Sequence, residues 1–225
     1  MTGTFVNCGA ILIGSTLGFT VGKFAPERFR TIMTHALGLA TILIGVRMAV
    51  SGSDALLTVG CLLCGGILGE WINVEKWVEK GGERLKKSFG SHSSTFVQGF
   101  VTTSILYLTG PMTIVGSIQD GVSGDASTLL LKAMLDGIAS IAFASLYGIG
   151  VAFSALSVLL VQGGITLSAS YLLFLKDPQM LNAIIATGGI LIVGIGLNLL
   201  NIIRIRVGNL LPSLLLVLVW MLLMR

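Results

Sequence analysis

The sequence is poor in charged residues. Aspartate, glutamate, lysine and arginine make up 11% of its 225 residues, whereas hydrophobic residues make up 54% and the mean hydropathy is +0.95. Soluble domains carry about 25% charged residues. The deficit therefore excludes a soluble globular protein and predicts an all-α fold, a polytopic helical bundle embedded in the lipid bilayer.

The signatures of enzymes and metal sites are also missing. The sequence has no phosphate-binding loop, dinucleotide fingerprint, G-x-S-x-G or H-E-x-x-H. His35 and His92 stand without a partner at metal-ligand spacing. We therefore expect no enzymatic activity, no cofactor and no metal site. The cysteines Cys8, Cys61 and Cys64 lie in apolar segments and are expected to pack as small residues, with a redox or metal role for the C-x-x-C pair as the alternative.

Charge-free runs predict eight membrane-spanning helices, since a span needs about 20 mostly apolar residues. The run 137–175 is too long for one span, and Gly148-Ile-Gly150 divides it. The first run lacks a positive leader, so we interpret it as a retained helix rather than a signal peptide. The expected spans are residues 2–22, 30–50, 54–72, 95–119, 126–147, 151–174, 179–203 and 206–224.

The segment 73–94 between the third and fourth spans differs from the other, shorter connections. Its apolar residues, including Val74 and Trp77, fall near one helical face together with the preceding Trp71, and charged residues occupy the rest. This pattern predicts an amphipathic cytoplasmic helix with tryptophans at headgroup depth. We expect Gly81-Gly82 to interrupt or end it. A regulatory role is the alternative to a solvated connector.

The distribution of lysine and arginine predicts the orientation of the chain. With eight spans, one side of the membrane receives ten of these residues and the other receives three, while Lys132 lies within a span. The positive-inside rule makes the first side cytoplasmic and places both termini outside. A re-entrant fourth segment would leave seven spans and weaken this split. The net charge of +4 therefore reflects cytoplasmic loops and does not indicate nucleic-acid binding.

Two regions of the single transmembrane domain, residues 1–225, resemble each other. Gly14-Ser-Thr-Leu, Ile42-Leu-Ile-Gly and Val59-Gly-Cys-Leu-Leu match Gly164-Ile-Thr-Leu, Leu191-Ile-Val-Gly and Val207-Gly-Asn-Leu-Leu, at offsets of 150, 149 and 148 residues. The candidate repeat units are 1–72 and 151–224, with the helices of 95–147 between them. An odd number of spans separates the two starts, so the repeat is inverted, as in many secondary transporters. Chance matches in a biased composition are the alternative.

A glycine–proline pair breaks the fourth span. Proline removes a backbone hydrogen bond, and in lipid the freed groups survive only beside protein or a water-filled cavity. Gly110 and Pro111 are followed by four polar residues that are candidates for lining a cation path: Thr113, Ser117, Gln119 and Asp120. An ordinary loop at Asp120 is the alternative.

Ionisable residues within spans are functional candidates because their burial is costly. Asp136 lies near the middle of the fifth span, and Lys132 lies one turn earlier on the same face. The pair is either a coupling site for a proton or cation or a structural ion pair. Asn7 and Asn198 are candidates for ligand contacts or for interhelical hydrogen bonds.

Glycine stripes predict close helix packing. Gly14, Gly18 and Gly22 form one stripe, and Gly65 and Gly69 form another. Such stripes pack helices within a monomer or across a homo-oligomer interface.

Several motifs together resemble the YqgA/YdfK-like bacterial membrane proteins. They are the opening Gly3-Thr-Phe-Val-Asn-x-Gly-Ala-Ile-Leu-Ile-Gly14, the stretch 38–48, Gly65-Gly-Ile-Leu-Gly-Glu70 and, most specifically, Gly110-Pro-Met-Thr-Ile-Val-Gly-Ser-Ile-Gln-Asp-Gly121. The resemblance spans nearly the whole chain. It implies a probable membrane transporter in the bacterial inner membrane, without a substrate or a mechanism.

The leading hypothesis is a secondary transporter of a small solute or cation, coupled to protons or cations. Asp136 is expected to be the coupling site and Asp120 an entry or coordination site. An ion channel would instead need an open polar path. A non-transporting scaffold or partner subunit would show Lys132 and Asp136 fully paired and no cavity.

Overall fold

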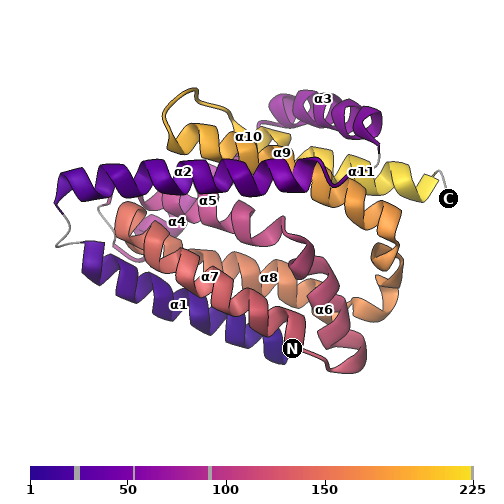
Figure 1. The fold of residues 1–225 in the computed structure, drawn as a ribbon, viewed down its shortest axis with the longest axis horizontal. Helices are drawn as coiled ribbons and strands as arrows, with labels where there is room; N and C mark the ends of the chain where they lie inside the picture. Colours follow the sequence, from indigo (N-terminus) through magenta and orange to yellow (C-terminus); the bar gives the residue numbers. More distant parts are fainter. Residues whose placement is uncertain (23–25, 53, 91–92, 224–225) are drawn as a thin grey trace. The chain divides into compact units, whose positions relative to one another are not determined.

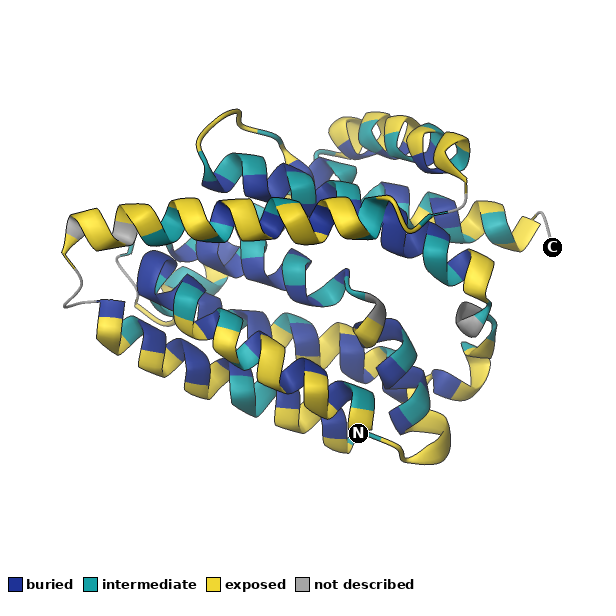
Figure 2. Cartoon of the chain, in the orientation of Figure 1, coloured by how far each residue is buried: buried dark blue, intermediate teal, exposed yellow. Residues whose placement is uncertain are grey.

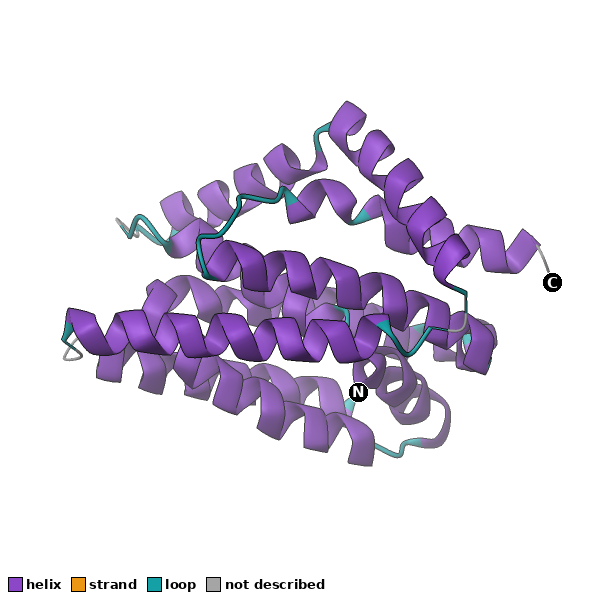
Figure 3. Ribbon diagram, turned by 45° about the horizontal axis from the view of Figure 1, so that its top comes forward, coloured by secondary structure: helices purple, strands orange, loops and turns teal. Residues whose placement is uncertain are grey.

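The computed structural model describes residues 1–22, 26–52, 54–90 and 93–223. Across these residues every regular element is a helix (Figures 1 and 3). His92 lies outside the described residues, as do Lys23 and Arg225, which were counted in the charge distribution above. The α-helices are α1 (Thr2–Gly22), α2 (Glu27–Ala49), α3 (Ala55–Ile72), α4 (Val74–Ser88), α5 (Phe96–Leu108), α6 (Pro111–Ser123), α7 (Ser127–Tyr147), α8 (Ser154–Leu167), α9 (Pro178–Leu199), α10 (Val207–Leu210) and α11 (Pro212–Leu223). Short 3₁₀ helices are η1 (Gly148–Phe153), η2 (Ala169–Tyr171) and η3 (Leu173–Lys176).

Five stretches of helix in the described ranges are long and apolar enough to cross a membrane, and six if α5 and α6 form one span. One stretch, Ser127–Leu167, runs through α7, η1 and α8, and Val207–Leu223 is a shorter apolar helix. The protein is therefore a multi-pass, all-helical membrane protein. The first three predicted helices agree with α1, α2 and α3 within a few residues.

The predicted breaks are confirmed at two places. Gly148, in the left-handed region at φ 77°, ends α7 where a side chain would be strained. The predicted helix 95–119 consists of α5 and α6, bent by 63°. Pro111 begins α6 because the first turn of a helix needs no N–H donor there.

Three predictions about the extent or continuity of helices were wrong. The helix expected at 151–174 ends at Leu167 and continues as η2 and η3. The helix expected at 206–224 is divided into α10 and α11, since Pro212 starts a new helix. Gly81-Gly82 does not interrupt α4. At Gly82 a Cβ would lie 3.1 Å from a Val97 methyl carbon, so close packing against α5 accounts for this glycine.

The chain divides into two compact units. Unit 1 comprises Met1–Met33 and Gly81–Leu175, and unit 2 comprises Thr34–Lys80 and Lys176–Arg225. Within unit 1 the glycine stripe of α1 packs against α7, and a Cβ on each glycine would collide with a backbone carbonyl oxygen. The contacts are Gly14 on Gly137, Gly18 on Ile141 and Gly22 on Ser145. Residue numbers rise together along both helices, so α1 and α7 run parallel.

Unit 2 is also assembled by glycine contacts, but its helix pairs run antiparallel. Along α2 and α9 the contacts are Gly38 with Leu200, Gly45 with Gly189 and Gly52 with Ala186. Between α3 and the α10–α11 segment they are Gly65 with Ser213 and Gly69 with Asn209. In both pairs one residue number rises as the other falls. The second predicted stripe, Gly65 and Gly69, therefore packs within the chain.

The outer faces of several helices are apolar. On α1, the side chains of Phe5, Ile13 and Val21 are all more than half exposed, which suits contact with lipid tails. Figure 2 shows exposed residues recurring along α1, α2 and α3, whereas α9 is mostly buried. The apolar exposure agrees with the membrane location.

Candidate functional site

The centre of unit 1 holds an ion pair between Lys132 and Asp136 on α7. The two residues are one helical turn apart, and their exposed fractions are 4% and 8%. The Lys132 ammonium donates to Asp136 Oδ2. The predicted pairing of these side chains is thus observed. Charges at this depth need partners, because isolated buried charges are costly.

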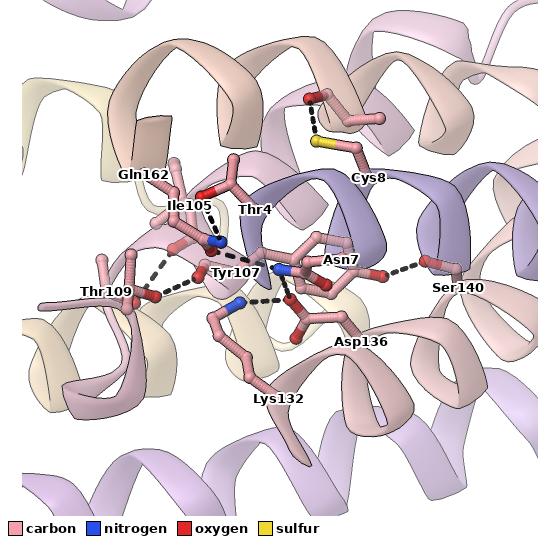
Figure 4. Close-up of polar contacts among 12 residues, drawn as sticks. Thr4, Asn7, Cys8, Ile105, Tyr107, Thr109, Lys132, Asp136, Ser140 and Gln162 are labelled. Atoms are coloured by element: carbon pink, nitrogen blue, oxygen red, sulfur yellow. Dashed lines mark hydrogen bonds and ion pairs between the residues drawn. The ribbon is translucent and has the colours of Figure 1, made fainter. Parts of the chain in front are cut away.

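Two amide side chains extend this pair towards α1 and α8 (Figure 4). Asn7 Nδ2 donates to Asp136 Oδ2 at 3.0 Å and to Gln162 Oε1 at 3.1 Å. Gln162 Nε2 donates to Thr4 Oγ1 at 3.2 Å. We call Thr4, Asn7, Lys132, Asp136 and Gln162 the polar cluster. It joins α1, α7 and α8 through side chains that are all buried.

Hydrogen-bonding capacity is left over in the polar cluster. Asn7 is fully buried, yet its Oδ1 has no hydrogen-bond partner. Both donors to Asp136, the Lys132 ammonium and Asn7 Nδ2, converge on Oδ2. Buried polar atoms are rarely left unpaired in native proteins. The cluster therefore retains acceptor oxygens beyond those its own donors use.

An apolar layer borders the polar cluster. Ile11, Tyr107, Ala155 and Val158 pack together in the core of unit 1. The Tyr107 ring lies under the Lys132 ammonium, 5.7 Å from it, and its hydroxyl bonds Ser140 Oγ at 2.8 Å. Ile11 lies one turn along α1 from Asn7, and Val158 lies one turn along α8 from Gln162, so the layer is the next turn along both helices from the cluster.

Polar residues resume beyond this layer. Ser15 follows Ile11 by one turn, and Ser154 precedes Val158 by one turn, so on each helix the order is polar, apolar, polar along one face. Both serines are fully buried, and Ser15 Oγ has no hydrogen-bond partner. Along both helices the apolar layer thus lies between the polar cluster and a buried serine.

The break between α5 and α6 is closed by its own side chains. Thr109 Oγ1 donates to the Ile105 carbonyl at 2.9 Å, and Thr113 Oγ1 donates to the Tyr107 carbonyl at 2.8 Å. Gly110 is the N-cap of α6, with an extended backbone. Thr113 and Gly110 therefore shape the break, and the bond from Thr113 holds the main chain of Tyr107 beside the polar cluster.

The predicted residues at the other end of α6 have different surroundings. Asp120 is buried, and its Oδ2 accepts from Gly3 N at 3.0 Å and lies 3.1 Å from the Met1 nitrogen. It caps the N-terminus of α1, where a carboxylate is favourable. Gln119 Oε1 accepts from Thr128 Oγ1 at 2.7 Å. Ser117 is fully buried, and its Oγ has no partner.

Asn198 is not part of the polar cluster. It lies in unit 2, where its Nδ2 donates to the Ile205 carbonyl at 2.8 Å and its Oδ1 accepts from Ile205 N at 2.7 Å. Both bonds close the turn after α9. In the described parts of the chain, no group of three or more histidine, cysteine or acidic side chains could hold a metal ion.

A second polar contact set lies in unit 2, where the end of α3 and the start of α4 meet α10. Glu70 accepts from Asn209 Nδ2 at 2.6 Å and pairs with Arg206 at 2.6 Å. Glu75 Oε2 accepts from Gly208 N at 2.8 Å, and burial raises the pKa of this carboxyl group. These bonds fix the start of α4 against α10.

Gln162 and Thr4 were not predicted, although they complete the polar cluster. A signal for Gln162 exists, because it is the only amide side chain in the charge-free run 137–175. Thr4 carries no such signal, since hydroxyl side chains are common in membrane helices and often bond their own backbone.

Comparison with known proteins gives a family but no activity. Residues 2–222 match the family model described as "Protein of unknown function (DUF554)". The chain is 32% identical to "Uncharacterized protein YqgA" of Escherichia coli (strain K12) over 220 residues, 95% of this chain and 93% of that protein. It is 33% identical to "Uncharacterized membrane protein YdfK" of Bacillus subtilis (strain 168) over 219 residues, 96% and 93% of the two chains. No solved structure matches.

Proposed function

The chain belongs to the DUF554 family of membrane proteins, and we propose that it is a secondary transporter of a small solute or cation, coupled through the polar cluster of unit 1. The observation that carries this proposal is the buried Lys132–Asp136 pair within a membrane helix. Ionisable side chains at this depth are rare and mark proton relays or ion paths in many membrane proteins.

The apolar layer supports a transporter rather than a channel. A channel conducts through a continuous polar path, whereas a transporter keeps at least one side closed. In this conformation Ile11 and Val158 lie between the polar cluster and Ser15. We propose that the layer is the closed gate on one side of the path, and that the Gly110–Pro111 break allows α5 and α6 to move during opening.

The helix directions support eight spans. On α1, the contacts Thr4–Thr166 and Asn7–Gln162 show numbers rising on one helix and falling on the other, so α8 is antiparallel to α1. Since α7 is parallel to α1, the stretch Ser127–Leu167 comprises two spans. If α2 and α3 each cross the membrane once, α7 runs parallel to α1 only when α5 and α6 together make one further crossing. Counting the α10–α11 segment as the last span gives eight.

The antiparallel pairs also support the inverted repeat. A two-fold axis in the membrane plane makes each repeat helix antiparallel to its mate. The proposed mates are α1 with α8, α2 with α9, and α3 with the α10–α11 segment, and each pair packs antiparallel within its own unit. Gly65 even contacts Ser213, its own counterpart at the offset of 148 residues. Such a self-matched contact is expected where a helix pair crosses the axis.

A non-transporting membrane scaffold is the second candidate. The observation that favours it is the direct pairing of Lys132 and Asp136, which leaves each charge with a partner. In that case the cluster would only hold α1, α7 and α8 together. A transporter would show flux across a membrane and a scaffold would not, so a flux measurement distinguishes them.

Flux assays with purified protein in liposomes test the proposal. A panel of monovalent cations and small solutes should reveal proton-linked or ion-driven flux in the wild type. The double variant Lys132→Gln/Asp136→Asn should abolish it without leaving a lone buried charge. Asp125→Asn, the same change at an exposed residue before α7, should retain flux. Absence of flux across the panel from folded protein would favour the scaffold.

A further inference from the structure

An apolar groove lies between α3 and α10 in unit 2. Its volume is about 610 Å³, within the range of about 300–1,000 Å³ that is usual for small-ligand sites. The side chains of Leu63 and Ile67, which line it, are more than half exposed. We call it the α3 groove, and its lining residues are Leu62, Leu63, Gly66, Ile67, Glu70 and Trp71 of α3 and Leu210 of α10.

The α3 groove is about as long as one leaflet of a bilayer. It extends from Leu62 to Trp71, which is about 14 Å along the helix at a rise of about 1.5 Å per residue. Half of the hydrocarbon core, which is about 30 Å thick, measures about 15 Å. Since α3 begins at Ala55, the groove is confined to the second half of the helix. This length suits a lipid acyl chain, whereas a helix of a second copy would be expected to contact all of α3.

Charged groups of both signs lie at the Trp71 end of the groove. Glu70 Oε1 pairs with Arg206 Nη1 at 2.6 Å, and Glu70 Oε2 accepts from Asn209 Nδ2 at 2.6 Å. The side chains of Arg206 and Glu70 are 60% and 48% exposed. A guanidinium group has five donors and a carboxylate about four acceptor positions, so this pair retains bonding capacity for a ligand. Trp71 is 84% exposed, and tryptophan is enriched at headgroup depth in membranes.

The charge balance at this end selects a headgroup that carries both signs. Glu75 interacts electrostatically with Arg204 and Arg206, so two carboxylates accompany two guanidinium groups. A purely acidic headgroup would be repelled by the carboxylate of Glu70. A phosphate that carries a primary ammonium group matches both signs, because guanidinium binds phosphate through its fixed N–H groups and a carboxylate accepts from an ammonium.

We propose that the α3 groove binds one aminophospholipid of the bilayer, of the phosphatidylethanolamine class. One acyl chain lies along Leu63 and Ile67, the phosphate binds Arg206, and the ammonium donates to Glu70. Phosphatidylcholine has the same charges, but its quaternary ammonium has no N–H donor for the carboxylate. Phosphatidylglycerol lacks the ammonium altogether. The site does not depend on the transport function proposed above.

Tryptophan fluorescence tests the site directly, because Trp71 lines the groove. Replacing Trp77 and Trp220 by phenylalanine leaves Trp71 as the only tryptophan. This protein is reconstituted into phosphatidylcholine bilayers that contain a small fraction of one lipid with brominated acyl chains, which quench tryptophan on contact. Brominated phosphatidylethanolamine should quench Trp71 as strongly as an about fivefold larger fraction of brominated phosphatidylcholine or phosphatidylglycerol, the equivalent of one exposed charged contact.

A substitution at Glu70 tests the headgroup contact. Glu70→Gln keeps an acceptor for Asn209 but leaves Arg206 without its carboxylate. The preferred lipid should therefore change from phosphatidylethanolamine to phosphatidylglycerol, a change that a merely structural role of Glu70 would not produce. Glu83→Gln, the same substitution at an exposed residue of α4 that is not among the lining residues, should keep the wild-type preference.

A substitution at Gly66 tests the acyl-chain contact. A Cβ there would lie 3.0 Å from Leu210 Cδ2, the end of a flexible side chain, so the ring of Gly66→Phe would fill the groove. The preference for phosphatidylethanolamine should disappear in this variant. Gly60→Phe is the matched control, since a Cβ at Gly60 of α3 has open space around it, and it should keep the preference.

Three results would overturn the proposal. Equal quenching by the three brominated lipids would mean that the groove holds only unselected bilayer lipid, and a preference for phosphatidylglycerol would mean an acidic-lipid site. Absence of quenching in protein that elutes as a dimer would mean that a second copy covers the groove. Folding of the variants is checked by size-exclusion elution. Since Glu70→Gln and Gly66→Phe act on different parts of the site, an unchanged preference in either folded variant would also overturn it.

Discussion

Removing one partner of the Lys132–Asp136 pair should destabilise the protein strongly. The exposed fractions of 4% and 8% leave little water to replace a lost partner. Breaking a buried ion pair typically costs about 3–5 kcal/mol because the remaining charge has no compensation. In a chain of this size about 1 kcal/mol corresponds to a Tm shift of about 2–4 °C, so Asp136→Asn should lower the Tm by about 6–20 °C.

Replacing both partners should have a much smaller effect. The double variant Lys132→Met/Asp136→Leu removes both charges and keeps much of the side-chain volume. Replacement of a buried ion pair by apolar residues is often neutral or stabilising. The double variant should therefore be more stable than Asp136→Asn, with a Tm closer to that of the wild type. The difference between the two variants measures the cost of the lone ammonium.

Thermal unfolding of purified protein in one detergent, followed by circular dichroism at matched concentrations, provides the measurement. Asp125→Asn controls for the chemical change at an exposed position and should change the Tm little, because an asparagine oxygen can still accept the hydrogen bond from Ser127 N. A Tm of Asp136→Asn equal to that of the wild type would refute the reasoning, since it would mean that Lys132 reaches water when its partner is lost.

Three further predictions concern packing, pH and topology. Gly18→Val should lower the free energy of unfolding by about 1–3 kcal/mol because its side chain would meet the Ile141 carbonyl. Gly9→Ala, with open space around it, should have little effect. Urea or heat unfolding in detergent compares the two variants, and equal stabilities would contradict the packing. Because burial raises the pKa of Glu75, the folded state binds more protons than the unfolded state just above the ordinary value of 4.5, so this group should reduce stability as pH rises through that window. Glu75→Gln should remove this part of the pH dependence. Parallel curves of stability against pH for the two proteins would contradict it. Single cysteines are introduced at Ser123 and at Ser88 in a variant without native cysteines. An impermeant maleimide should label the cysteine at Ser123 from outside intact cells and should not label the one at Ser88. Labelling of both positions from the same side would contradict a single crossing by α5 and α6.

The sequence predicted the ion pair but not the full cluster around it. Lys132 and Asp136 are one turn apart on one helix, so local spacing was sufficient to pair them. The contacts of Asn7 with Asp136 and Gln162 join helices far apart in the sequence. Which face of α8 meets α1 depends on tertiary packing, and hydropathy does not specify it. The partnership of Gln162 was therefore missed.

Helix positions were largely predictable because the bilayer requires long apolar runs and internally bonded backbones. The break at Gly110–Pro111 was also readable from residue chemistry. The break before Pro212 was missed although it has the same cause, the lack of an N–H donor. The opposite error was made at Gly81-Gly82, where a break was predicted and α4 continues. Packing of Gly82 on α5 explains the presence of this glycine.

Asn198 shows why the role of a polar residue in an apolar segment is not predictable from the sequence alone. Its two bonds to Ile205 satisfy the turn after α9, and this partner is seven residues further along the chain. An asparagine that caps a turn and one that binds a ligand have the same local sequence context. Only the observed partners distinguish the structural Asn198 from Asn7, which has an unsatisfied oxygen.

Proton-linked or ion-driven flux across proteoliposomes is the most direct measurement. Vesicles loaded with a pH-sensitive dye and given an inward gradient of a monovalent cation or a small solute report proton-linked flux as a change of internal pH. The account predicts such flux with at least one cation or solute for the wild type and for Asp125→Asn, and none for folded Lys132→Gln/Asp136→Asn. Equal rates for the wild type and the double variant would contradict the central role of the polar cluster. Absence of any cation or solute flux with folded wild-type protein would contradict transport itself.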